Sequence, residues 1–437
     1  MCYAIPGRVK AFEGKYITVD YFGEERRAVN ELSGLALGDY VYAQGGFVIT
    51  KVSAREAELT LETWKDLFFE LQAIDEKSVA ISPWSGKKYE HVRGFMDRIL
   101  AGGKITREET RYLLGVTSSG EKEFLFSAAN YLRQQHHKNS CCVHGIIEIS
   151  NTCVEGCHYC GISSFHKALV RYRMSKDEIL EAVRSAVEDH GFKALVLQSA
   201  EDPGRSVDEL VDIITEIKQR FGVLIFISFG EIGLQGLERL YAAGARGLLL
   251  RFETSNPGLY AKFHPGSSWD ERIAHIKKAN ELGYLIVTGS LIGLPGQTLD
   301  DLARDIELAG ELNVEMLSMG PFLPHPATPL AHMPSPSVED VAQVLAVARF
   351  TLDPDVKILV TTGFETLSLE ARRIGLMAGA NSVMLNVTPV DKRALYNIYP
   401  GRAHQDDTID AQIQGTIKML EGLGRAPTDL SVGQDDN

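Results

Sequence analysis

The chain has 437 residues, of which 44% are hydrophobic and 24% charged, and its formal net charge is −13 at pH 7. These values are typical of soluble globular proteins, and the length allows two or three domains, or one large barrel with a small module. The chain is acidic and has no long basic stripe, so it lacks the positive surface of a nucleic-acid-binding protein. It also has no run of eighteen apolar residues and no signal-peptide pattern, so we expect no membrane segment and a cytoplasmic location.

Residues 1 to about 52 predict small β structure, with the pair Gly45-Gly46 marking a hairpin. Ser53 is followed three residues later by Glu56, a capping-box pattern that predicts a helix running through Leu71. We therefore expect an OB-like β-barrel domain with a carboxyl-terminal helix over residues 1–75, and a linker over 76–95. The predicted strands are 16–21, 26–29, 39–43 and 47–50.

After a helical stretch from about Val92 to Gln135, strands and amphipathic helices alternate with near-regular spacing. Eight strand-then-helix units predict an α/β fold, a (β/α)8 TIM-type barrel over residues 96–437, with its active site at the carboxyl ends of the strands. A doubly wound open sheet also alternates, but it usually has fewer strands and a phosphate-loop fingerprint, which this sequence lacks. The predicted strands are 145–149, 194–198, 224–228, 247–251, 285–289, 315–319, 357–361 and 382–385, and the predicted helices include 176–189, 207–221, 269–282 and 299–312.

Three of the six cysteines follow the first barrel strand with the spacing Cys-x3-Cys-x2-Cys, at Cys153, Cys157 and Cys160. A cubane iron–sulfur cluster needs four ligands, so three thiolates leave one iron open for an outside chelator. Sparse, clustered cysteines also favour metal chemistry in a reducing compartment over a disulfide framework. A structural zinc loop is the alternative, and it would need His158 or His166 to complete four ligands. The adjacent Cys141 and Cys142 are interpreted as packing thiols.

Polar residues recur at the ends of the next strands, where they fall on one predicted face. Carboxylates there can hold an amine, and arginine can make bidentate hydrogen bonds to a carboxylate, so the pattern suits a zwitterionic ligand. The residues concerned are Gln198, Glu201, Ser228, Arg251, Glu253 and Ser290, with Arg272 in a following helix.

The cysteine spacing, with Tyr159 before the third cysteine, resembles the radical S-adenosylmethionine (SAM) superfamily. Five longer stretches resemble HydE, the radical SAM maturase of [FeFe]-hydrogenase, which is related to biotin synthase and methylornithine synthase; they are 146–153, 197–203, 289–298, 320–330 and 386–389. The likeness covers about residues 95–425.

This resemblance implies that the three cysteines ligate a [4Fe-4S] cluster that reduces SAM to a 5′-deoxyadenosyl radical. It also implies SAM contacts from Tyr159, Gln198, Glu201, Ser228, Arg251, Glu253, Arg272 and Ser290, and a central cavity bordered by Met316 and Thr361. Two features depart from the family: Phe252 stands where HydE has a histidine, which bears on substrate identity, and the carboxyl-terminal cysteines of a second cluster are absent, so one cluster is predicted.

The opening nonapeptide, Met1 to Val9, resembles the HypC/HupF hydrogenase assembly chaperones, and the likeness continues to about Leu71. In that family the cysteine at position 2 carries the Fe(CN)2CO unit of [NiFe]-hydrogenase between the HypD scaffold and the large subunit. The resemblance therefore implies that Cys2 is a ligand for an Fe(CO)/(CN) complex. Gln44 stands where the chaperones usually have a histidine, a change that weakens or alters such a site.

These features together predict a fused hydrogenase maturase. The barrel would make or modify a diatomic ligand or its iron-bound precursor, and the amino-terminal module would carry or dock the product. The implied partners are a HypD-like scaffold, a hydrogenase large subunit on the nickel–iron side, and a reductant such as ferredoxin or flavodoxin. Two alternatives stay open: a non-catalytic carrier or scaffold for an iron complex, and a radical SAM enzyme for a small amino-acid-like substrate.

Overall fold

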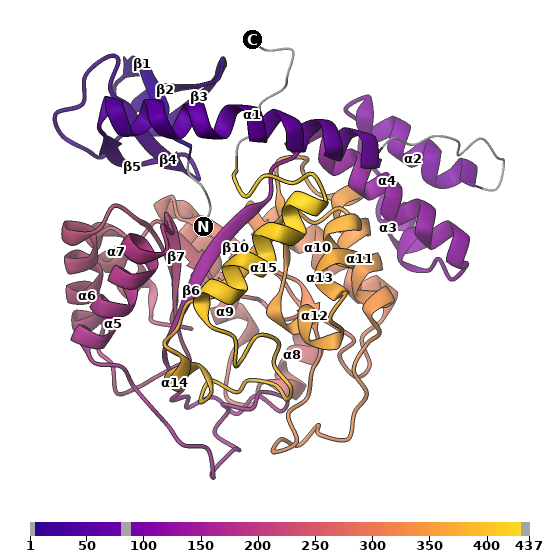
Figure 1. The fold of residues 1–437 in the computed structure, drawn as a ribbon. Helices are drawn as coiled ribbons and strands as arrows, with labels where there is room; N and C mark the ends of the chain where they lie inside the picture. The colour runs from indigo at the N-terminus through magenta and orange to yellow at the C-terminus, as the bar shows by residue number, and fades with distance from the viewer. Residues whose placement is uncertain (1–4, 80–88, 430–437) are drawn as a thin grey trace.

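A closed barrel of eight parallel strands forms the centre of the molecule (Figure 1). The computed structural model describes residues 5–79 and 89–429. The hydrogen-bonded strand order is β10-β12-β14-β15-β6-β7-β8-β9, which confirms the predicted (β/α)8 architecture. The strands are β6 (Cys142–Ser150), β7 (Ala194–Ser199), β8 (Leu224–Ser228), β9 (Gly247–Leu249), β10 (Leu285–Thr288), β12 (Val314–Leu317), β14 (Lys357–Val360) and β15 (Ser382–Asn386).

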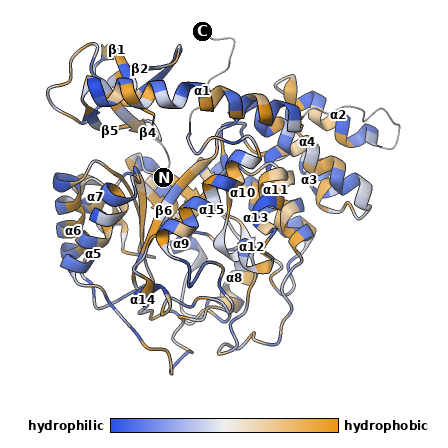
Figure 2. Cartoon of the chain, viewed as in Figure 1, coloured by the Kyte–Doolittle hydropathy of each residue, from blue (hydrophilic) through white to orange (hydrophobic). Residues whose placement is uncertain are grey.

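Helices surround this large barrel, and many of them carry both hydrophilic and hydrophobic residues (Figure 2). Capping boxes at Ser175, Ser206, Thr298 and Ser337 fix where four of them begin. A two-stranded sheet of β11 (Leu291–Ile292) and β13 (Gly320–Pro321) extends beyond β10 and β12. The helices are α5 (Lys176–Arg184, continued by a π-helical turn over Ser185–Asp189), α6 (Val207–Arg220), α7 (Leu234–Ala243), α8 (Pro257–Phe263), α9 (Trp269–Leu282), α10 (Leu299–Glu311), α11 (Val338–Thr351), α12 (Thr362–Leu367), α13 (Ala371–Met377), α14 (Val390–Arg393) and α15 (Ile409–Gly422).

The predicted small β-barrel is present and closes in the order β1-β2-β3-β5-β4. Its strands are β1 (Gly7–Glu13), β2 (Tyr16–Tyr21), β3 (Glu24–Val29), β4 (Tyr40–Gln44) and β5 (Phe47–Val52). Strand β1 was not among the predicted strands. A bulge between Val9 and Ala11 interrupts its pairing with β2. Cys2 lies outside the described residues.

Four helices connect the small barrel to the large one: α1 (Ala54–Val79), α2 (Glu90–Leu100), α3 (Arg107–Leu114) and α4 (Ser119–His137). Helix α1 begins where predicted, with the Glu56 amide donating to Ser53 Oγ over 3.2 Å. It continues past the predicted end at Leu71, because Leu71, Asp75 and Val79 are all buried on one face. Of the expected linker, residues 76–79 belong to α1 and 90–95 to α2. Within 5–79 and 89–429, no helix combines the length and apolar composition that crossing a bilayer requires.

The small barrel covers the amino-terminal end of the large one. Tyr42, Ile49 and Val52 of the small barrel share one hydrophobic cluster with inward-facing residues of the large barrel such as Phe226 and Met316. At the tip of the β4–β5 hairpin Gly45 has a φ of +57°, and a Cβ there would lie 2.7 Å from Leu285 Cδ1. The positive φ therefore favours glycine at this tip, and a larger residue would also displace the Leu285 side chain.

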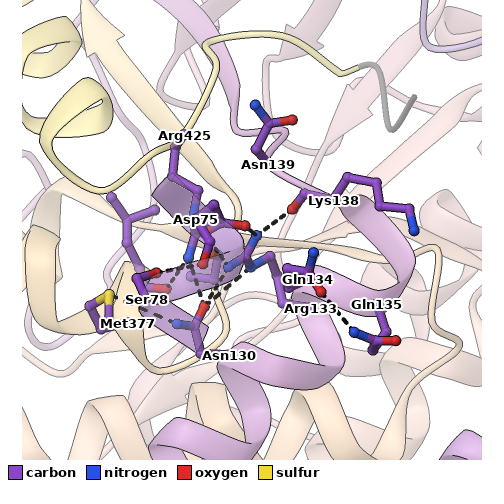
Figure 3. Close-up of polar contacts among 12 residues, drawn as sticks. Asp75, Ser78, Asn130, Arg133, Gln134, Gln135, Lys138, Asn139, Met377 and Arg425 are labelled. Atoms are coloured by element: carbon purple, nitrogen blue, oxygen red, sulfur yellow. Dashed lines mark hydrogen bonds and ion pairs between the residues drawn. The ribbon is translucent and has the colours of Figure 1, made fainter. Parts of the chain in front are cut away.

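A buried polar network fixes α1 to the large barrel (Figure 3). Asp75 is fully buried and accepts two hydrogen bonds from Arg133 of α4, at 2.7 and 2.8 Å, and one from Arg425 at 3.0 Å. Asn130 Oδ1 accepts from both arginines. One carboxylate thus pairs with two guanidinium groups. Burial, together with the positive charge of Arg133, lowers the pKa of Arg425 to about 10.

Replacing Asp75 with asparagine should strongly destabilise the protein, because it leaves two buried arginines without a counter-charge. Removing one partner of a buried ion pair typically costs about 3–5 kcal/mol. The change should appear as a lower thermal midpoint and a lower urea midpoint. Glu13→Gln is the matched control, since Glu13 pairs with Arg27 on the exposed surface and such pairs contribute little. Equal midpoints for the two variants would contradict the role assigned to Asp75.

Candidate active site

A cavity of about 310 Å³ opens at the carboxyl ends of the barrel strands, opposite the small barrel. All three clustered cysteines line it, as predicted from their position after β6. The predicted SAM contacts Tyr159, Gln198, Glu201, Ser228, Arg251, Glu253 and Arg272 line the same cavity, and so does Thr361. Side chains from distant parts of the sequence therefore converge on one space large enough for a small-molecule ligand.

The cysteine loop is held by backbone hydrogen bonds to several neighbouring loops. The Val154 amide donates to the Glu201 carbonyl at 3.1 Å, and the His158 amide to the Phe263 carbonyl at 3.0 Å. The Gly161 amide donates to Ile398, and a Cβ at Gly161 would lie 2.2 Å from the Asn397 carbonyl oxygen. These contacts fix the loop without using its thiols, which stay directed at the cavity.

The three thiols suit a cluster better than a single zinc ion. Burial raises the pKa of each of them, that of Cys160 to about 12, and a bound metal reverses this because thiolate is the ligating form. The histidines of the zinc alternative do not line the cavity: His158 packs against Phe165, and His166 Nδ1 lies 2.7 Å from the Gly161 carbonyl oxygen. Three thiols facing one cavity fit a [4Fe-4S] cluster with one open iron.

Arg272 lines one wall of the cavity and pairs with two carboxylates, Glu201, which also lines the cavity, and Glu231, which does not. Its Nη2 is 3.2 Å from Glu201 Oε1, and its Nε is 2.7 Å from Glu231 Oε1. Burial, with Glu155 and Glu231 nearby, raises the pKa of Glu201 to about 7 despite Arg272. Because carboxylates outnumber the guanidinium here, this wall favours a ligand group with positive charge.

Arg251 and Glu253 form an ion pair on the adjacent wall, with Arg251 Nη2 2.9 Å from Glu253 Oε2. Glu253 has a φ of +66°, which is rare for a residue other than glycine. Its amide donates to the Gly289 carbonyl and its carbonyl accepts from Leu291, so the neighbouring strand end imposes this conformation. Strained backbone of this kind persists where the surroundings over-determine it, often at ligand sites.

The structure places three of the named residues away from the cavity. Ser290 is fully buried and is not among the residues that line the cavity. Phe252 is also fully buried and packs in the outer core, so the departure from the HydE histidine lies in packing and not in the cavity lining. Met316 lies at the amino-terminal end of the barrel and not beside the central cavity, because inward residues of one strand occupy successive layers.

Several cavity residues lie outside the predicted set. One of them is His264, whose Nε2 lies 2.8 Å from the hydroxyl oxygen of the predicted residue Tyr159. Glu155, which lies within the cysteine loop, was detectable in principle. So was Glu231, three residues after β8, which pairs with Arg272 but does not line the cavity. Arg402, which pairs with the fully buried Glu148, comes from a distant carboxyl-terminal loop that no local pattern marks.

Comparisons with known proteins agree with this architecture. Residues 147–309 match the family model of the radical SAM superfamily, and residues 1–64 match that of the HupF/HypC family. The chain is 40% identical over 324 residues to the [FeFe] hydrogenase maturase subunit HydE of Thermotoga maritima, covering 74% of this chain and 92% of that protein. The chain belongs to the HydE family of radical SAM enzymes.

More distant members of the superfamily share the barrel. The 3-methylornithine synthase of Methanosarcina acetivorans is 27% identical to this HydE-family enzyme over 343 residues, which cover 77% of this chain and 95% of that protein. The solved structure of methylornithine synthase (PylB) aligns with a TM-score of 0.67 and 25% identity, over 76% of this chain and 97% of that one. Membership of the radical SAM superfamily implies a [4Fe-4S] cluster and SAM as cofactors.

The raised pKa of Glu201 should make the stability of the ligand-free enzyme fall as pH rises. In the unfolded chain this carboxyl titrates near 4.5, but in the folded protein near 7. The stability it contributes is therefore present below pH 4.5 and lost as the pH rises to about 7. Glu201→Gln should reduce the drop in thermal midpoint between pH 5 and pH 8, whereas Glu58→Gln on the exposed face of α1 should leave it unchanged. A Glu201→Gln drop equal to wild type would refute the assignment.

Proposed function

We propose that this HydE-family enzyme is a hydrogenase maturase that uses SAM radical chemistry to make or modify a diatomic ligand or its iron-bound precursor. The observation that carries the proposal is the convergence of the three thiols with Arg251, Glu253 and Arg272 on one cavity. The HydE relative, named as a maturase subunit of [FeFe] hydrogenase, and the HupF/HypC match at the amino terminus support the hydrogenase context.

In this proposal Cys153, Cys157 and Cys160 hold the [4Fe-4S] cluster. When bound, the cluster supplies the electron that cleaves SAM to a 5′-deoxyadenosyl radical and methionine. The carboxylates beside Arg272 would take the cationic end of SAM, and a guanidinium would take its carboxylate. Gln198, Ser228 and Tyr159 would border the ligand, while Ser290 would act only through the Glu253 backbone beside it.

Charge at the cavity supports this choice of ligand. Four carboxylates line it against three guanidinium groups, and SAM at neutral pH carries a sulfonium, an ammonium and one carboxylate. The lining carboxylates are Glu148, Glu155, Glu201 and Glu253, and the guanidinium groups belong to Arg251, Arg272 and Arg402. A site with this excess of carboxylates matches a ligand with net positive charge, which would in turn favour the ionised form of Glu201.

The amino-terminal module would carry or dock an iron complex, with Cys2 as a ligand for an Fe(CO)/(CN) unit. The HupF/HypC match supports a target on the nickel–iron side, with a HypD-like scaffold and a hydrogenase large subunit as partners and ferredoxin or flavodoxin as reductant. Gln44, at the position where the chaperones usually have histidine, is buried against the large barrel. The domain limits we propose are 1–75, 76–95 and 96–437.

Reductive cleavage of SAM tests the enzymatic proposal. Anaerobically reconstituted protein with a strong reductant should release 5′-deoxyadenosine and methionine, measured by liquid chromatography. Cys157→Ala should abolish both products, because the cluster would lose one of its three ligands. Cys2→Ala should retain them, since the module lies at the opposite end of the barrel. Intact cluster without any cleavage would overturn the proposal.

The same two variants distinguish the enzymatic proposal from the alternative of a non-catalytic carrier. If the barrel were only a scaffold, Cys2→Ala would remove binding of the iron complex and Cys157→Ala would leave hydrogenase maturation nearly unchanged. Maturation of a co-expressed hydrogenase is the readout. We expect Cys157→Ala to reduce it below detection.

A further inference from the structure

A buried thiol and imidazole face each other at the amino-terminal end of the large barrel. Cys142 Sγ lies 3.5 Å from His144 Nε2. Both residues belong to β6, and their i, i+2 spacing directs both side chains to the same face of the strand, here the barrel interior. They lie at the other end of β6 from the cysteine loop, so they belong to neither the cavity nor the proposed cluster.

The small barrel adds a third polar group to this pair. Gln44, the last residue of β4, is 3% exposed, and its Nε2 is 3.8 Å from Cys142 Sγ. Its Oε1 has no hydrogen-bond partner among the described residues, and neither has His144 Nδ1. A buried polar atom without a partner is destabilising, because it has lost its hydrogen bonds to water. Gln44 Oε1, an unpartnered acceptor buried beside a thiol and an imidazole, needs an explanation such as a bound ion.

The three residues line a small cavity of about 10 Å³, which is space for one water molecule or one metal ion. Glu315 and Lys357 also line it and pair with each other at 2.6 Å, so they neutralise each other. Asp429 closes the remaining side and lies against the Gly45 amide at 3.4 Å. Burial and Lys357 lower the pKa of His144 to about 3, which keeps the imidazole neutral.

We propose that Cys142, His144 and Gln44 bind one thiophilic divalent cation, Fe²⁺ or Zn²⁺, at the interface between the two barrels. A tetrahedral ion with a metal–sulfur distance near 2.3 Å and a metal–nitrogen distance near 2.0–2.1 Å holds those two ligand atoms about 3.5 Å apart. The observed separation has this value. On binding, the Cys142 thiol releases its proton to solvent and the thiolate becomes the ligand.

The Gln44 amide supplies the third donor. Rotating the amide by half a turn exchanges Oε1 and Nε2, which are distinguished only by their hydrogen bonds, and directs the unpartnered oxygen toward the thiol. The site therefore depends on the small barrel, because the large barrel contributes only two of its donors.

A cobalt titration tests the site in full-length protein. The background variant replaces Cys2, Cys153, Cys157 and Cys160 with alanine, which leaves Cys141 and Cys142 as its only cysteines. Adding Co²⁺ under anaerobic conditions should produce a thiolate-to-cobalt charge-transfer band that saturates at one equivalent. In this background Cys142→Ser should abolish the band, and His144→Gln and Gln44→Leu should each raise the Kd for Co²⁺ at least tenfold.

Cys141→Ser is the matched control. Cys141 is adjacent and equally buried, but it packs in the outer core cluster and not at the small cavity. It should keep the band at full intensity. As a second measurement, Zn²⁺ should raise the thermal midpoint of the background variant and leave that of Cys142→Ser unchanged.

Two results would overturn the proposal. If the background variant gives no band and no thermal shift, the thiol and the imidazole are only a buried hydrogen-bonded pair. If the band persists in Cys142→Ser, the cation binds elsewhere. Because every variant in this experiment lacks the proposed cluster ligands, the result is independent of SAM cleavage.

Discussion

One buried carboxylate fixes helix α1 to the large barrel. Asp75 lies near the end of α1 and is bonded to two arginines, one from α4 and one from the segment after α15. Three segments far apart in the sequence therefore meet at one charge. A buried carboxylate is tolerated only while hydrogen-bonded groups of opposite charge stay beside it. The same contact thus joins α1 and the carboxyl-terminal segment to the large barrel, whereas apolar contacts hold the hairpin of β4 and β5 against the strand ends.

In the large barrel, the contacts that stabilise the fold and the residues of the candidate site lie at opposite ends of the axis. Its amino-terminal end is sealed by apolar contacts with the small barrel, whereas its carboxyl end carries the thiols, carboxylates and guanidinium groups. This is the usual division in (β/α)8 enzymes, because loops after the strands can vary without disturbing the packed layers. The ring of backbone hydrogen bonds around the cysteine loop shows how such variable loops are nevertheless made rigid.

Much of this arrangement could be predicted from the sequence. The eight strands of the barrel carry short apolar runs with regular spacing, and the polar residues directly after them had to meet at one rim. What could not be predicted depends on contacts distant in sequence. Ser290 follows a strand as the other site residues do, but its side chain is fully buried and does not reach the cavity. The length of α1 depended likewise on Arg133 and Arg425, which carry no local signal for a helix near residue 75.

Strand β6 has a further consequence for how the two modules can cooperate. It runs from Cys142, under the small barrel, to Ser150, just before the cysteine loop. Nine residues at about 3.3 Å each amount to about 30 Å, and the packed barrel interior lies between the ends. Fusion therefore keeps the two modules at a one-to-one ratio, but the mouth of the cavity faces away from the attached module. A product released there would have to travel around the molecule, and an acceptor docked on a second molecule could be as near as the one in the same chain.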